Sequence, residues 1–105
     1  KVGRHIRPKP HFKMMVARDA GETRYLGGYK KQFKQLIMRS HSGPITLIEG
    51  DDLQIEDIEL AAQIAARYGQ GRDAESVEFE YSDKQQSGYR FSVKPMNAAD
   101  IDPQW

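Results

Sequence analysis

Cysteine is absent from this sequence of 105 residues. That absence excludes disulfide bridges, cysteine-based zinc sites and thiol nucleophiles from the chain. It is compatible with a reducing compartment, and we expect a cytoplasmic protein. No apolar run reaches the roughly 20 positions that a membrane-spanning helix needs, so we expect no membrane partner.

Recognisable catalytic and cofactor motifs are also missing. Neither glycine-rich stretch, at residues 27–28 and 69–71, has the spacing of a phosphate-binding P-loop. The three histidines lack the spacing of metal ligands. His41 and Ser42 are adjacent, but no third group is evident that would orient a catalytic base. We therefore predict no catalytic residue, no metal and no cofactor, and an enzyme in its own right is the weakest hypothesis.

Charge is abundant but divided unevenly along the chain. Residues 1–40 hold eleven basic and two acidic residues, a net charge of +9. Residues 41–105 hold five basic and thirteen acidic residues, a net charge of −8. Such asymmetry indicates a polyanion-binding N-terminal half. The alternative is that the two halves neutralise each other across the folded surface.

Hydropathy patterns predict one α+β domain. Short apolar or alternating segments predict strands at residues 11–17, 35–40, 45–49, 77–81 and 89–93. Helical spacing of apolar residues predicts one principal helix from Gln54 to Tyr68, ended by Gly69. We expect a mostly antiparallel sheet of four or five strands with the helix on one face and the other face open to ligands.

The two ends of the chain look different from this domain, which we place at residues 11–95. Pro8 and Pro10 predict that residues 1–10 form an extended lead-in or linker. Residues 18–23 read as a turn, and residues 96–105 as a tail that Trp105 could pin. Because the first residue is Lys rather than Met, we expect a part of a longer protein.

Basic and aromatic residues alternate through the first forty positions, as in Tyr25, Tyr29 and Phe33 beside lysines and arginines. Cations bind phosphates, and aromatic rings stack on unpaired bases. The interpretation is RNA binding, with Lys30, Lys31 and Lys34 as the densest cluster. The predicted phosphate contacts are Arg4, Arg7, Lys9, Lys13, Arg18, Lys30, Lys31, Lys34 and Arg39. Secondary contacts are predicted from Ser40, His41, Ser42 and Arg72.

Several segments resemble the NFACT RNA-binding domain over residues 8–95. Residues 16–26, Val-Ala-Arg-Asp-Ala-Gly-Glu-Thr-Arg-Tyr-Leu, resemble its opening strand and turn. Residues 58–68 resemble its alanine-rich helix, and residues 76–81 resemble the strand that follows. Residues 11–13, 28–33 and 41–44 are similar to the variant found behind the tRNA thiouridylase domain of TrmU- and ThiI-like proteins.

The resemblance implies a domain that holds RNA, most simply tRNA, for a catalytic domain elsewhere on the parent chain. Arg18 matches an arginine of the family. The better-known branch carries a Trp and a His in its third strand and then a Gly-Ser-His turn, where this chain has residues 36–39 and 40–43. Binding residues of that branch are therefore not carried over. The alternative hypothesis is a structural module whose basic half docks on an acidic parent or partner domain.

Overall fold

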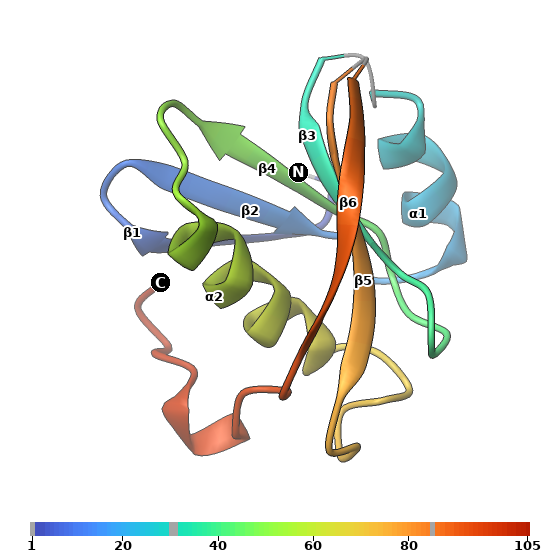
Figure 1. Cartoon of the computed structure of the whole chain (residues 1–105), viewed down its shortest axis with the longest axis vertical. Helices are drawn as coiled ribbons and strands as arrows, with labels where there is room; N and C mark the ends of the chain where they lie inside the picture. Colours follow the sequence, from blue (N-terminus) through green and yellow to red (C-terminus); the bar gives the residue numbers. More distant parts are fainter. Residues whose placement is uncertain (1, 30–31, 85) are drawn as a thin grey trace.

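The protein forms one sheet with two helices (Figure 1). The computed structural model describes residues 2–29, 32–84 and 86–105. In chain order the elements are β1 (Arg4–Lys9), β2 (Phe12–Val16), α1 (Ala20–Gly27), β3 (Lys34–Met38), β4 (Thr46–Gly50), α2 (Ile55–Ala66), β5 (Val77–Asp83), β6 (Gln86–Val93) and a 3₁₀ turn at Ala98–Asp100. Neither α1 nor α2 has the length and apolar character of a membrane-crossing helix.

Three hairpins lie side by side in the order β1-β2-β4-β3-β5-β6, and every neighbouring pair is antiparallel. The helices connect the hairpins, α1 after the first and α2 after the second. The predicted antiparallel α+β class is confirmed. The predicted count is wrong, because the described residues form a sheet of six strands and two α-helices.

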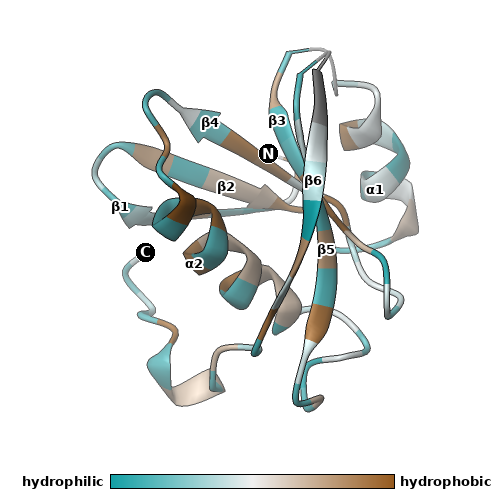
Figure 2. Ribbon diagram, viewed as in Figure 1, coloured by the Kyte–Doolittle hydropathy of each residue, from teal (hydrophilic) through white to brown (hydrophobic). Residues whose placement is uncertain are grey.

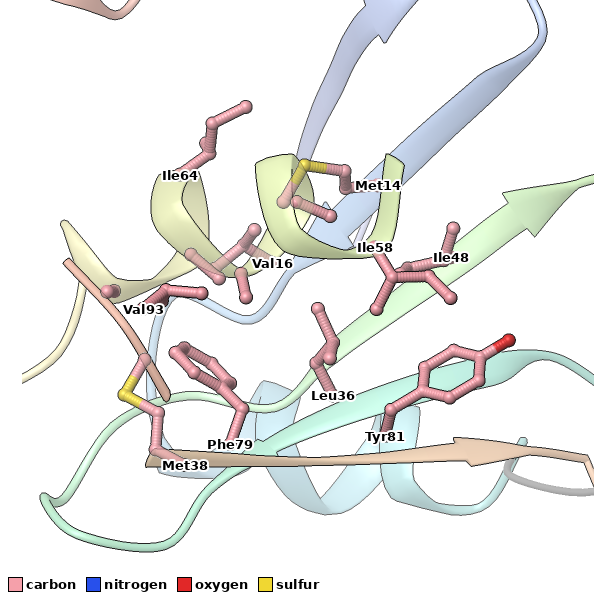
Figure 3. Packing of buried hydrophobic residues seen from close by; sticks show 14 of the residues in the cluster. Met14, Val16, Leu36, Met38, Ile48, Ile58, Ile64, Phe79, Tyr81 and Val93 are labelled. Atoms are coloured by element: carbon pink, nitrogen blue, oxygen red, sulfur yellow. The ribbon is translucent and has the colours of Figure 1, made fainter. Parts of the chain in front are cut away.

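The larger part of the core lies between α2 and one face of the sheet. Leu36, Phe79 and Ile58 meet there (Figure 3). Four buried alanines of α2 let its backbone approach the strands closely: Ala61, Ala62, Ala65 and Ala66. Figure 2 shows the matching alternation of apolar and polar bands along β5, whose apolar residues point to this face. The tail also packs here, through Met96, Ile101 and Trp105.

A smaller cluster lies on the opposite face, under α1. Leu26 of α1 packs there with Met15 and Leu47. Met14 and Met15 are neighbours on β2 but belong to the two different clusters. Since successive side chains of a strand point to opposite faces, the two helices cover opposite faces of the sheet. The face predicted to be open is therefore partly covered.

The segment predicted as a lead-in is the edge strand β1. Arg4 pairs with Val16, and Ile6 pairs with Met14. The register shifts between Ile6 and Lys9, around Pro8. Proline cannot donate a ladder hydrogen bond, but an edge strand with an irregular register tolerates it. The two prolines therefore indicated an edge position rather than a linker.

The segment predicted as a turn contains the start of α1. Asp19 has extended backbone geometry and accepts a hydrogen bond from the Glu22 amide at 2.8 Å. An acidic N-cap with Glu three residues later is a capping pattern. Aspartate and glycine favour both turns and helix starts, so the local pattern does not distinguish the two.

Candidate nucleic-acid interface

A groove of about 580 Å³ opens at the end of the sheet where β2 leads into α1. Three segments line it: residues 18–24, residues 42–44 between β3 and β4, and residues 68–70 after α2. We call residues 18–24, 42–44 and 68–72 the groove end. The groove end thus brings together the start of α1, the residues after α2 and the loop between β3 and β4.

Backbone contacts hold the three segments together. The Ala17 amide donates to the Ile45 carbonyl at 3.0 Å, beside the start of α1. The Gln70 amide donates to the Ser42 carbonyl at 2.8 Å, which ties the end of α2 to the β3–β4 loop. Gly69 allows this approach, because a Cβ there would lie 3.1 Å from the Ser42 carbonyl oxygen. The walls of the groove are therefore fixed by the fold.

Arg18 is held in place by Glu22. The Arg18 Nη2 and Glu22 Oε2 atoms are 2.7 Å apart, and the Arg18 amide donates to Glu22 Oε1 at 2.8 Å. The side-chain hydrogen bond from Arg18 lowers the pKa of Glu22 to about 2, and the pair raises the pKa of Arg18. About half of the Arg18 side chain stays exposed, and Arg18 lines the groove.

Arg24 lies farther along α1 and is exposed. Among the residues that the structure describes, no carboxylate forms an ion pair with it. Asp19 also lines the groove, but its Oδ1 accepts the Glu22 amide as the helix cap. The hydroxyls of Thr23 and Ser42 and the positive end of the α1 dipole complete a surface suited to phosphate oxygens.

Further arginines lie around the rim. The Arg4 guanidinium carbon lies 4.9 Å from the centre of the Tyr68 ring. Arg72 Nη1 donates to the Gly69 carbonyl at 3.2 Å, and Arg67 Nη1 donates to the Arg72 carbonyl at 3.0 Å. The structure therefore brings four predicted residues to this end: Arg4, Arg18, Ser42 and Arg72.

Three predicted residues lie between the groove and the uncovered part of the sheet. Arg39 Nε donates to Glu80 at 2.8 Å. Ser40 Oγ lies 2.8 Å from His41 Nδ1 and accepts the Glu78 amide at 2.8 Å. These contacts connect the β3–β4 loop to β5. The uncovered sheet face, where binding was expected to concentrate, thus holds arginine–glutamate pairs.

Four predicted residues lie at the opposite end of the sheet, among carboxylates. We call residues 7–13, Lys34 and residues 49–57 the acidic end. Lys13 Nζ is 3.6 Å from Glu49 Oε1, and Lys34 Nζ donates to the Gly50 carbonyl at 3.0 Å. Arg7 and Lys9 lie in the same region, beside a depression lined by Glu49, Asp51, Asp52, Glu56 and Asp57. Lys30 and Lys31 lie outside the described residues.

A histidine–aspartate contact stabilises the acidic end. His11 Nε2 lies 2.9 Å from Asp57 Oδ2, and the same oxygen accepts the Gln54 amide at 3.0 Å. The Gln54 amide is the main cause of the lowered pKa of Asp57, followed by His11. The contact ties the β1–β2 hairpin to the start of α2. Among the described residues, no three His, Asp or Glu side chains come together as a metal site.

Sequence reasoning missed the groove residues Thr23, Arg24, Tyr68 and Gln70. Arg24 belongs to the basic half, but it follows the predicted turn at residues 18–23, so the sequence does not predict its place on a helix. The spacing of Asp19 and Glu22 was the available signal for that helix. No local pattern revealed the approach of Gln70 to Ser42, which depends on tertiary packing.

Fold and groove together define a small α+β domain of antiparallel hairpins with arginines gathered at one end. The sequence model of the NFACT protein RNA-binding domain matches residues 3–105. The chain belongs to this family, which confirms the resemblance to the NFACT RNA-binding domain and supports RNA as the class of partner. A search of curated proteins finds no match.

A solved structure shows the same architecture. The C-terminal part of the fibronectin/fibrinogen-binding protein from Streptococcus suis aligns with a TM-score of 0.79 and 14% identity. The alignment covers 96% of this chain and 47% of that one, so the chain spans about half of its length. At this identity the likeness shows the fold alone.

Proposed function

We propose that this domain is a non-catalytic RNA-binding module whose groove end contacts the phosphate backbone. The observation that carries the proposal is the exposed Arg24 beside the fixed Arg18 in a groove shared by α1 and the end of α2. Membership in a family of RNA-binding domains supports RNA as the polyanion.

The groove would act by electrostatic contact rather than by reading sequence. Guanidinium groups form charge-assisted hydrogen bonds with phosphate oxygens, often through two nitrogens at once. Arg18 is preoriented by Glu22, so it loses less side-chain freedom on binding than a mobile lysine would. Each phosphate neutralised releases counterions, which makes the affinity depend on salt.

The finer proposal is that the RNA is tRNA and that the domain serves a tRNA-thiolating catalytic domain in the same parent protein, in the cytoplasm. The segments at residues 11–13, 28–33 and 41–44 support it through their similarity to the thiouridylase-associated variant. The domain would then supply substrate binding, and the chemistry would belong to its partner domain.

Fluorescence anisotropy with labelled tRNA at several salt concentrations tests the proposal. We expect log affinity to fall linearly with log salt, with a slope that gives the number of phosphates engaged. An unrelated RNA hairpin serves as comparison, and equal affinity for both would contradict the tRNA preference alone. Absence of binding at low salt would contradict RNA binding and favour docking on a parent domain.

A further inference from the structure

A second pocket, of about 240 Å³, lies on the opposite side of α1 from the groove. Tyr25, Leu26 and Tyr29 line it on the helical side. Val2, His5, Met15 and Leu47 come from the β1, β2 and β4 region of the sheet, and Phe33 also lines it. We call this the aromatic pocket.

Its aromatic rings are arranged in series and partly open to solvent. The ring centres of Tyr25 and Tyr29 are 5.4 Å apart, and those of Tyr29 and Phe33 are 6.4 Å apart. Tyr25 is 53% exposed, although the protein has an apolar core that excludes most large side chains from solvent. The planes of Tyr25 and Tyr29 are tilted by 54° and those of Tyr29 and Phe33 by 60°, so a flat ligand would stack on the exposed face of the single Tyr25 ring.

Polar atoms accompany these rings. The hydroxyl groups of Tyr25 and Tyr29 lie 3.0 Å apart in a mutual hydrogen bond. His5 Nε2 donates to the Val2 carbonyl at 3.1 Å, while His5 Nδ1 has no hydrogen-bond partner among the described residues. The pocket therefore combines flat apolar faces with hydrogen-bonding capacity that an aliphatic side chain could not use.

We propose that the aromatic pocket receives one unpaired nucleobase of the RNA strand whose phosphates occupy the groove, an inference that rests on the proposed RNA binding. Arg24 in the groove and Tyr25 in the pocket are consecutive residues on α1. A helix is about 10 Å across with its side chains, a distance that a few nucleotides of flexible strand can span.

The chemistry of the surroundings favours a base over the apolar side chain of a protein partner. Stacking on tyrosine suits any base, because every base has an aromatic face. The base edge carries donors and acceptors that match the tyrosine hydroxyls. Arginines on the same helix provide the phosphate contacts that must accompany a bound nucleotide.

The test uses two labelled single-stranded probes, an oligouridylate and the same oligomer with abasic positions at its centre. Tyr25→Ala removes the ring, Tyr25→Phe keeps it, and Tyr89→Ala removes a tyrosine of β6 that is 42% exposed. We expect Tyr25→Ala to weaken oligouridylate binding by roughly 5- to 150-fold, the range for losing one stacked base. Tyr25→Phe keeps the ring and loses only the hydroxyl that faces Tyr29, so it should lose clearly less affinity than Tyr25→Ala. Tyr89→Ala should stay within about twofold of the unmodified protein on the same scale.

The dependence of affinity on salt, measured with both probes, distinguishes failure of the pocket proposal from failure of the proposed RNA binding. The unmodified protein should bind the abasic probe more weakly than the oligouridylate, and Tyr25→Ala should not weaken abasic binding further. If both probes bind in a salt-dependent way and Tyr25→Ala changes neither affinity, the proposal that the pocket binds a base is wrong. The proposed RNA binding would still hold. Equal loss for both probes would show a structural role and also overturn it. Failure of the unmodified protein to bind either probe would overturn RNA binding itself.

Discussion

The groove end and the acidic end lie at opposite ends of the same sheet, and both contain basic residues from the first forty positions. At the groove end, Arg24 is exposed and has no ion pair within the described part of the chain. At the acidic end, Lys13 faces Glu49 at 3.6 Å, and the neighbouring depression is lined by five carboxylates. Arg24 is thus available to a polyanion at the groove end, whereas carboxylates oppose Lys13 at the acidic end.

Antiparallel pairing produces this difference. The pairing of β2 with β4 places Lys13 opposite Glu49, so a basic segment meets an acidic one. The −8 of residues 41–105 therefore neutralises part of the +9 of residues 1–40. A basic segment of the sequence forms a basic surface only where the topology does not pair it with an acidic segment. The acidic end fits the alternative in which the two halves neutralise each other, and the groove end is where we propose that a polyanion binds.

The largest effect is expected on stability, at the acidic end. In Gly50→Ala the added Cβ would lie 2.6 Å from the His11 carbonyl oxygen and 2.6 Å from Phe12 Cβ. Such crowding against backbone should lower the free energy of unfolding by about 1–3 kcal/mol in urea titrations. RNA affinity of the folded protein should not change.

Gly27→Ala is the matched control for this substitution. Gly27 ends α1, and an added Cβ there meets nothing within 4 Å. We expect no loss of stability and a gain of up to about 1 kcal/mol. Equal destabilisation by the two substitutions would contradict the close packing at Gly50.

The second prediction compares two charge reversals of equal size. Arg24→Glu with Arg72→Glu should weaken RNA binding by about tenfold and flatten the salt slope, because two phosphate contacts are lost. Lys9→Glu with Lys13→Glu changes the net charge equally and should have a much smaller effect. Anisotropy at matched salt measures both. The distinction between the two ends would be wrong if the Lys9→Glu and Lys13→Glu variant lost more RNA affinity than the Arg24→Glu and Arg72→Glu variant.

The third prediction concerns Asp57, whose carboxylate accepts the Gln54 amide and contacts His11. Asp57→Ala should cost about 1 kcal/mol of stability through the lost cap. Because the folded pKa is lowered from 3.8, this stabilisation is present above about pH 3.8 and disappears as the pH falls through the lowered value.

Asp51→Ala provides the control, since Asp51 is an exposed carboxylate of the same end. Urea unfolding of both variants and the unmodified protein at pH 6 and at progressively lower pH measures the difference. The curves of Asp57→Ala and the unmodified protein should converge in acid. A gap that stays constant with pH would exclude the ionised carboxylate as its source.

The smallest effect is expected for Glu22→Gln at the groove end. The pKa of Glu22 is lowered from 4.5 to about 2, so its contribution to stability is present above pH 4.5 and is lost between pH 4.5 and about 2. The pair is solvent-exposed, so salt should reduce the contribution further. Removing the negative charge beside Arg18 should also strengthen RNA binding slightly. The expected gain assumes that the removed charge outweighs the loss of the Glu22 contacts that orient Arg18. Weaker binding would contradict this prediction.

The central elements of the fold were predictable from sequence because their patterns are local. Alternation of Val77, Phe79 and Tyr81 gave β5, and helical spacing ending at Gly69 gave α2. The edge strand β1 and the helix α1 were missed, because proline and aspartate have more than one structural use. Which use applies depends on neighbours that are distant in sequence.

The candidate site was predictable only in part. Arg18 emerged from charge and from family resemblance, and Arg72 and Ser42 were secondary choices that the structure places nearby. Lys13 and Lys34 were equally plausible from their charge. Strand pairing, which sets Lys13 against Glu49, separates Lys13 from Arg24. Lys34 differs from Arg24 because its Nζ donates to the Gly50 carbonyl. The type of residue indicated phosphate binding, and the tertiary structure indicates which of the basic residues lie together at the groove.

The most direct test is an NMR titration of the isotope-labelled chain with tRNA, following every assigned backbone amide. The proposed interface predicts shifts and broadening at residues 18–24, 42–44 and 68–72, with residues 9–13 and 49–57 little changed. Perturbations concentrated at the acidic end, with the groove unaffected, would contradict the assignment of RNA binding to the groove end.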